Sequence, residues 1–255
     1  MRRRKNQAFR PGTVRNHMVA IRAYFGFCFK FKLQALCPST LTVCMFVEFL
    51  ARTFTCAKSI KNYISAVRLL HKRLDIDAPG LYSFDLQLML RALKISLGGP
   101  RQRLPITVDI LHQLCATCDL IGSLGTVLKC VFLFAFFRFL RCSNLAPPSE
   151  TAFDFHPHLS RGDIFIHDTQ VVIMIKWSKT LQAHERFILL PLPSLPNHPL
   201  CPLTALRVIL RSCPAPSTSP FFLLPGKHTT RLLTAPRLRH LLAQLLQALG
   251  LSPSL

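Results

Sequence analysis

The chain has 255 residues, half of them hydrophobic, which is enough for one large or two ordinary domains and excludes disorder as its general state. Its 32 Lys and Arg residues outnumber 11 Asp and Glu residues, and the net charge is +21. This surplus exceeds what solubility requires and is typical of proteins that bind a polyanion, most often nucleic acid.

The positive charge is concentrated in the first part of the chain. Residues 1–105 hold 19 Lys and Arg against 4 acids (+15), whereas residues 106–255 hold 13 against 7 (+6). Residues 1–12 are a basic N-terminal tail. The first part is therefore the stronger candidate for contacts with a phosphate backbone.

The cysteines and the apolar runs indicate a compartment and exclude some partners. Ten cysteines are scattered without a secretory pattern, and no signal-like apolar region precedes them, so we expect a nuclear or cytoplasmic protein that is not secreted. Cys115 and Cys118 form a C-x-x-C with His112 one turn earlier, but a fourth ligand is not evident, so we predict buried helix cysteines, no metal and no cofactor. The most apolar run, residues 130–137, is far shorter than the ~20 residues of a membrane span.

Residues 13–97 are predicted to form a helical domain. Apolar periodicity and capping residues favour four helices, beginning near Thr13, Ser39, Ser59 and Phe84. The first is expected to bury one face, made of Val14, Met18, Ile21 and Phe25. Gly98-Gly99-Pro100 and the residues up to 105 are predicted to be a linker to a second domain, residues 106–255.

The third helix separates apolar from basic residues. Its predicted buried stripe is Ile60, Ile64, Val67 and Leu74. The opposite face is polar and basic, with Lys58, Lys61, Ser65, Arg68 and Lys72. A charged face is usually solvated and supported by ion pairs one turn apart, but no acid occurs between Glu48 and Asp75. We therefore predict that Lys58, Lys61, Arg68 and Lys72 contact DNA phosphates.

The second domain is predicted to mix helices with a small sheet. Helices are expected at about 107–121 and 125–140, and strands at 163–167, 171–177 and 186–192. A proline-rich stretch, 191–225, surrounds one short helix, and a leucine-rich helix follows from about Thr234 to Gly250. The fold class is therefore mainly α with a small β-sheet.

Two segments of this domain resemble the catalytic domain of tyrosine recombinases. The string "FFRFLRCSNL", residues 136–145, is similar to the box that carries the first catalytic arginine, and the match places Arg141 in that position. The string "KWSKTLQ" resembles the hairpin that carries the catalytic lysine, here Lys179. "SIKNYISAVRLLH" looks like part of the helical, SAM-like core-binding domain of DIRS/Ngaro-type retroelement recombinases.

The resemblance implies DNA recombination and integration through a phosphotyrosyl link. A planar guanidinium matches two non-bridging phosphate oxygens, and a lysine on a hairpin tip supplies a proton to the departing 5′-oxygen. Arg141 and Lys179 are therefore the predicted catalytic residues, and Arg138 and Lys176 are further predicted DNA contacts. The implied partner is duplex DNA, with a homo-oligomer on that DNA left open and no small-molecule substrate.

The sequence also departs from the family pattern. Asn144 stands where the family has a glutamate, which predicts weaker support of Arg141. The family continues into H-x-x-R and then a nucleophilic tyrosine, whereas the three tyrosines here are Tyr24, Tyr63 and Tyr82, and the string His228 to Arg231 precedes the last helix. We expect a catalytic domain without its C-terminal part and without activity of its own.

Two alternatives stay open. The chain is either a truncated recombinase or a non-catalytic nucleic-acid-binding protein domesticated or decayed from a retroelement. A protein that binds anionic membrane surfaces is the third class. The positive charges of this chain are spread over several helices and the chain has one Trp, and both observations disfavour this class.

Overall fold

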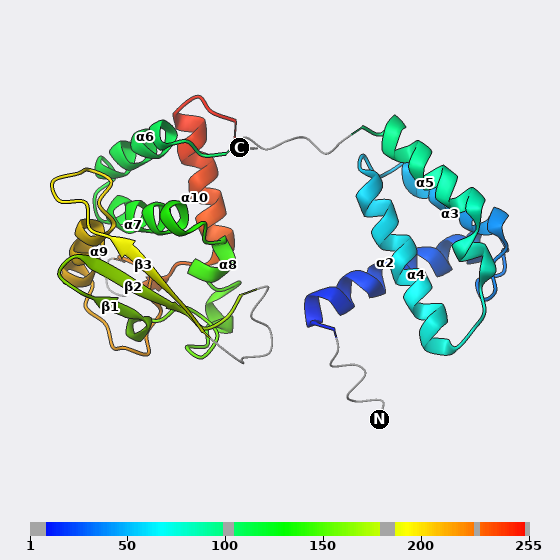
Figure 1. Ribbon diagram of the computed structural model, residues 1–255, viewed down its shortest axis with the longest axis horizontal. Coiled ribbons are helices and arrows are strands. Elements are labelled where there is room, and N and C mark those ends of the chain that lie inside the picture. Colours follow the sequence, from blue (N-terminus) through cyan, green and yellow to red (C-terminus); the bar gives the residue numbers. More distant parts are fainter. Residues whose placement is uncertain (1–8, 99–104, 179–186, 227–229, 253–255) are drawn as a thin grey trace. The chain divides into compact units, whose positions relative to one another are not determined.

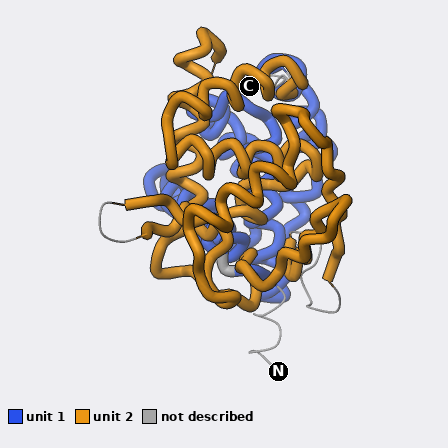
Figure 2. The backbone as a smooth tube through the Cα atoms, turned by 90° about the vertical axis from the view of Figure 1, so that its left-hand side faces the viewer, with its two compact units in different colours: residues 1–102 blue, residues 103–255 orange. Residues whose placement is uncertain are grey.

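The computed structural model describes residues 9–98, 105–178, 187–226 and 230–252. The chain separates into two compact units, residues 1–102 and 103–255, coloured separately in Figure 2. The division falls between residues 98 and 105, where the sequence predicted a linker. Mainly helical structure with small antiparallel sheets agrees with the predicted fold class (Figure 1).

Unit 1 is helical throughout its described part. It contains α2 (Pro11–Lys30), α3 (Thr40–Ala51), α4 (Ala57–Leu74), the 3₁₀ turn η1 (Pro79–Tyr82) and α5 (Phe84–Ser96). Helix α2 packs along α4, and α3 packs against α4, α5 and η1. The buried centre is aromatic and aliphatic, with Tyr24, Phe46, Ile60, Ile64 and Leu81 among its fully buried side chains.

Local sequence signals explain the ends of several helices. The Ser39 hydroxyl accepts a hydrogen bond from the amide of Thr42 and the Ser83 hydroxyl one from the amide of Leu86, as N-caps do. The third predicted helix begins at Ala57, two residues earlier than expected, and buries Ile60, Ile64 and Val67 as expected. Leu74, predicted to be buried, is 51% exposed because the helix ends there.

The predicted buried face of α2 is wrong. The helix begins at Pro11 after Arg10, without a side-chain cap from Thr13. Val14, Met18 and Phe25 lie on its exposed side, while the neighbouring face with Tyr24 and Phe27 enters the core. Apolar residues occur on both faces of this helix, so periodicity alone could not choose the buried one.

Unit 2 packs helices on a small antiparallel sheet. Its helices are α6 (Val108–Asp119), α7 (Ser123–Arg138), α8 (Cys142–Leu145), α9 (Pro202–Ser212) and α10 (Ala235–Ala248), with 3₁₀ turns η2 (Glu150–Ala152) and η3 (Arg161–Asp163). The sheet has the order β1 (Ile164–Ile166), β2 (Gln170–Ile175) and β3 (Ile188–Pro193), and each pair is antiparallel. A two-stranded sheet, β4 (Leu223–Leu224) with β5 (Arg231–Leu232), was not predicted from the proline-rich sequence.

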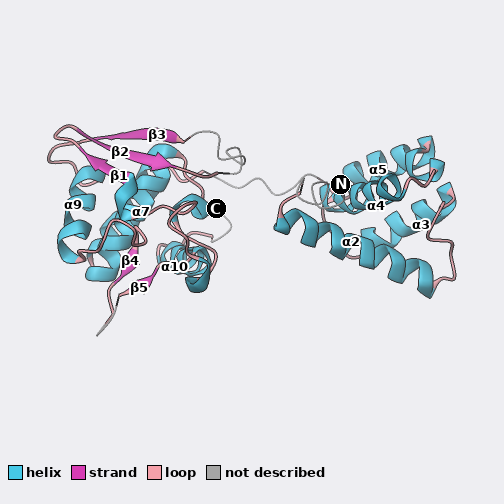
Figure 3. Cartoon of the chain, turned by 90° about the horizontal axis from the view of Figure 1, so that it is seen from below, coloured by secondary structure: helices cyan, strands magenta, loops and turns pink. Residues whose placement is uncertain are grey.

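The core of unit 2 lies between the three-stranded sheet and the helices. Helix α7 and helix α9 pack against the sheet, which forms a layer at the edge of the unit in Figure 3. Helix α7 is apolar on all sides and is buried accordingly, with Val131, Leu133 and Phe134 at or near full burial. Helix α10 packs on α6 and α8 through Leu238 and other leucines of its predicted stripe.

Candidate nucleic-acid interface

The exposed face of α4 carries unpaired lysines. Lys58, Lys61 and Lys72 are all exposed, and none pairs with a carboxylate in the part of unit 1 that the structure describes. The opposite face of the same helix is held in the core by Ile60 and Ile64. The amphipathic pattern therefore fixes the lysines on one solvent-facing side, which we name the α4 lysine face (Lys58, Lys61 and Lys72).

Arg68 belongs to the same side of α4 but is engaged within the unit. Its Nε donates a hydrogen bond to the carbonyl oxygen of Leu81 at 2.8 Å, and its guanidinium carbon lies 5.0 Å from the ring centroid of Tyr82. The Nζ of Lys72 lies 5.7 Å from the same ring. Arg68 is half-buried and ties α4 to η1, so it is not the free phosphate contact that the sequence predicted.

In unit 2, Arg141 lies in the sharp connection between α7 and α8. Helix α7 ends at Arg138, and the next residue, Phe139, has a left-handed backbone (φ +49°) that lets its own amide and that of Leu140 bond back to the helix. Arg141 then precedes α8, and its side chain is exposed. No partner of its guanidinium occurs among the residues that the structure describes, so its donors face solvent.

Asn144 connects Arg141 to the end of β2. Its Oδ1 accepts a hydrogen bond from the backbone amide of Arg141 at 3.1 Å, and its Nδ2 donates to the carbonyl oxygen of Trp177 at 3.2 Å. The sequence predicted that the missing glutamate would weaken the support of Arg141. The side-chain carboxamide of Asn144 instead accepts one hydrogen bond and donates another, so it links the backbone of Arg141 to Trp177. Lys179 follows Trp177 by two positions and lies outside the described residues.

Lys176 and Arg138, the other two residues of unit 2 that were predicted to contact DNA, have half-buried side chains. Lys176 forms an ion pair with Asp163, Nζ to Oδ2 at 2.6 Å, and also donates to the carbonyl oxygen of Phe155. Arg138 is half-buried, and its Nε is buried without a hydrogen-bond partner in the described structure. These tertiary contacts were not predictable from sequence spacing, and contact of Lys176 and Arg138 with DNA stays a prediction.

The cysteine pair of α6 faces the core of unit 2. Burial raises the pKa of Cys115 to about 11 and that of Cys118 to about 12, so both are thiols at neutral pH. Among the described residues no group of His, Cys, Asp and Glu side chains is arranged to hold a metal ion. Within the same residues, no helix combines the length and the apolar character needed to cross a membrane.

No protein-family model matches the chain, and no curated protein sequence matches it significantly.

Proposed function

We propose that the chain binds duplex DNA through the α4 lysine face. The observation that carries this proposal is the set of three exposed lysines on one side of α4, without acidic partners in the described structure. Helices α2 and α4 contain no acidic residue at all, so nothing on them neutralises this charge. Lysines in such a position release condensed counterions when they bind phosphates, which supplies affinity without sequence preference.

We further propose that unit 2 is of the tyrosine-recombinase type. The exposed guanidinium of Arg141 supports this, because its parallel donors suit a phosphate. The Asn144 link supports it as well, since it joins the backbone of Arg141 to Trp177, close in sequence to Lys179. The guanidinium of Arg141 and the ammonium of Lys179 are the pair that the family chemistry would require near one phosphate.

The proposed activity is binding without strand cleavage. Residues 103–255 contain no tyrosine. In unit 1, Tyr24 is fully buried, and its hydroxyl donates a hydrogen bond to the carbonyl oxygen of Ala35. A tyrosine nucleophile beside Arg141 is therefore not supplied by unit 2 itself.

Two measurements test the proposal. Binding of a fluorescent duplex should weaken with a linear fall of log affinity against log salt, and a flat response would remove the electrostatic basis of the proposal. A nicked suicide substrate should leave no covalent protein–DNA adduct after denaturation. An adduct would show that a nucleophile of this chain reaches the phosphate and that the protein is an enzyme.

A further inference from the structure

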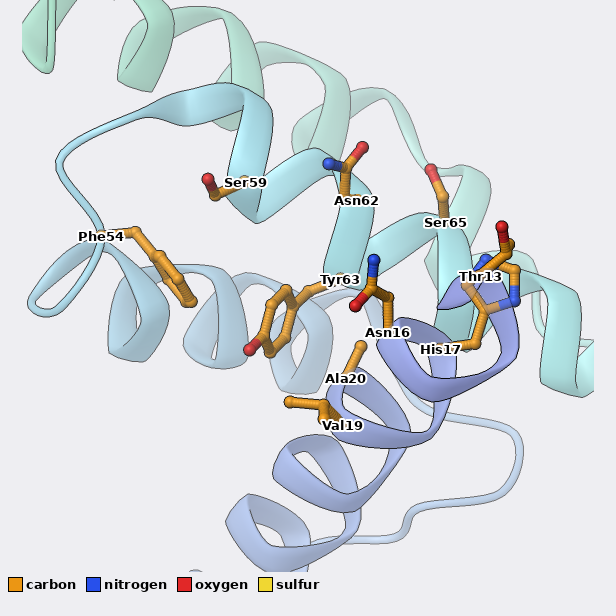
Figure 4. Close-up of a pocket in the computed structure, with 10 residues that line it drawn as sticks. All are labelled: Thr13, Asn16, His17, Val19, Ala20, Phe54, Ser59, Asn62, Tyr63 and Ser65. Carbon is orange, nitrogen blue, oxygen red and sulfur yellow. The ribbon is translucent and has the colours of Figure 1, made fainter. Parts of the chain in front are cut away.

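A groove of mixed polar and apolar lining runs beside the α4 lysine face, between α2 and α4. It encloses about 380 Å³ and is shown in Figure 4. Its lining includes Asn16, Val19 and Ala20 from α2, Phe54 from the connection before α4, and Asn62 and Tyr63 from α4. The phosphate contacts proposed above leave the chemistry of this groove unused.

Two asparagines line the groove, Asn16 from α2 and Asn62 from α4, whose carboxamide points away from α2 in Figure 4. Asn16 and Asn62 are both exposed, and neither side chain makes a hydrogen bond to any residue that the structure describes. The carboxamide of Asn16 extends from α2 toward α4 in Figure 4. Each side chain therefore offers a donor and an acceptor side by side to a ligand.

Cations adjoin both carboxamides. Lys58 precedes Asn62 by one helical turn and so lies on the same side of α4, and Lys61 is its neighbour in the chain. The exposed Arg15 directly precedes Asn16 on α2. A polyanion held by the α4 lysine face is thus brought to the groove, which makes DNA bases the next groups within reach of the asparagines.

The other wall of the groove is apolar. The rings of Phe54 and Tyr63 lie 5.0 Å apart between centroids, and both are half-buried. Val19 is exposed beside the buried Ala20. A methyl group would be desolvated against the ring and aliphatic faces of this wall.

We propose that this groove reads A·T base pairs from the major groove, with Asn16 and Asn62 as the base-reading residues. Adenine presents an acceptor, N7, next to a donor, the N6 amino group, which matches the paired donor and acceptor of a carboxamide. Guanine presents two acceptors, which one carboxamide does not match, and thymine adds a methyl group for the apolar wall. The inference rests on the proposed DNA binding and adds the sequence preference that the lysines do not provide.

The first test uses the unmodified full chain and duplexes of defined composition. Selection from a random duplex pool should enrich a site with A·T pairs at fixed positions. Replacing adenine there by 7-deazaadenine, which lacks the N7 acceptor but keeps the N6 amino donor, should remove part of the about 5- to 150-fold that a whole bidentate base contact contributes. Selection of a G·C motif, or equal affinity for the 7-deaza duplex, would overturn the assignment.

The second test changes the protein. Asn16→Ala and Asn62→Ala, alone and together, should reduce the preference for the selected site over a G·C duplex while leaving the salt dependence of binding unchanged. Gln113→Ala removes an exposed carboxamide from α6 in unit 2 and should leave the preference intact. A double variant that keeps the full preference contradicts the proposal.

The outcomes separate this inference from the proposed function. Binding with full salt dependence but no selected motif would refute base reading by the groove and leave DNA binding in place. Absence of binding to every duplex would refute both. Circular dichroism and thermal melting of each variant check that the fold is kept, and the 7-deazaadenine arm needs no variant at all.

Discussion

Replacing the α4 lysine face by glutamines should lower the salt dependence of DNA binding by a calculable amount. Each phosphate contact contributes about 0.9 to the slope of log affinity against log salt, so Lys58→Gln, Lys61→Gln and Lys72→Gln together should lower the slope by about 2.7. Through these three contacts alone, a rise from about 50 to about 200 mM salt weakens binding about 40-fold in the wild type. These side chains are exposed and touch no carboxylate in the described structure, so their loss should leave the fold unchanged.

The assay is fluorescence anisotropy of a labelled duplex, titrated with each protein at several salt concentrations. A control variant with the same loss of charge carries Lys94→Gln, Arg207→Gln and Arg211→Gln, three exposed side chains on α5 and α9. The control should keep the wild-type slope within about one unit. An unchanged slope in the α4 variant would show that these lysines do not contact DNA. An equal loss in the control would show that net charge, and not position, governs binding.

Three further predictions concern the fold. Gly125→Ala should destabilise unit 2 by about 1–3 kcal/mol in thermal melting, since an added Cβ would lie 1.8 Å from the carbonyl oxygen of Cys118, whereas Gly26→Ala, with open space around it, should stabilise α2 by about 0.5–1 kcal/mol. Burial lowers the pKa of His158, whose Nδ1 accepts a hydrogen bond from the backbone amide of Asp154. Because the folded state then binds fewer protons than the unfolded chain, stability that is present above about pH 6.5 should be lost as the pH falls. The loss should be smaller in His158→Gln. Iodoacetamide should label the exposed Cys37 in the native protein and the buried Cys118 only after unfolding, as mass spectrometry of the two peptides would report.

Each of these predictions has a result that contradicts it. Equal melting temperatures for the two glycine variants would show that α6 and α7 do not cross as closely as described. If the melting temperature depends on pH in the same way in the wild type and in His158→Gln, titration of His158 does not contribute to stability. Rapid native labelling of the buried thiol would mean that the core of unit 2 opens readily.

Helix positions were predictable where cap and periodicity agree. In α3 and α5 a serine caps the first turn, and both helices begin where the sequence placed them. In α2 the apolar residues cover two faces, and the choice between Val14 and Tyr24 depends on the neighbouring helix α4. The short pairing of β4 with β5 also depends on tertiary contacts, since two residues carry no periodic signal.

The candidate site was predictable in the same uneven way. The exposure of Lys58 and Lys61 follows from the helical period and the missing acids. Arg68 bonds to Leu81, and Lys176 pairs with Asp163, each across 13 positions of the chain. The first contact joins α4 to η1, and the second joins the residue after β2 to η3. Sequence spacing does not encode such partners, and the role of Asn144 as a link was hidden for the same reason.

Lysine footprinting would locate the bound DNA on the surface of the protein. The full chain is acetylated with and without saturating duplex DNA, and the modified lysines are quantified by mass spectrometry. We predict that Lys58, Lys61 and Lys72 are protected by the duplex while the exposed Lys94 on α5 reacts as it does in the free protein. Equal acetylation of the three α4 lysines with and without bound DNA would contradict the account, because the duplex would then lie on another surface.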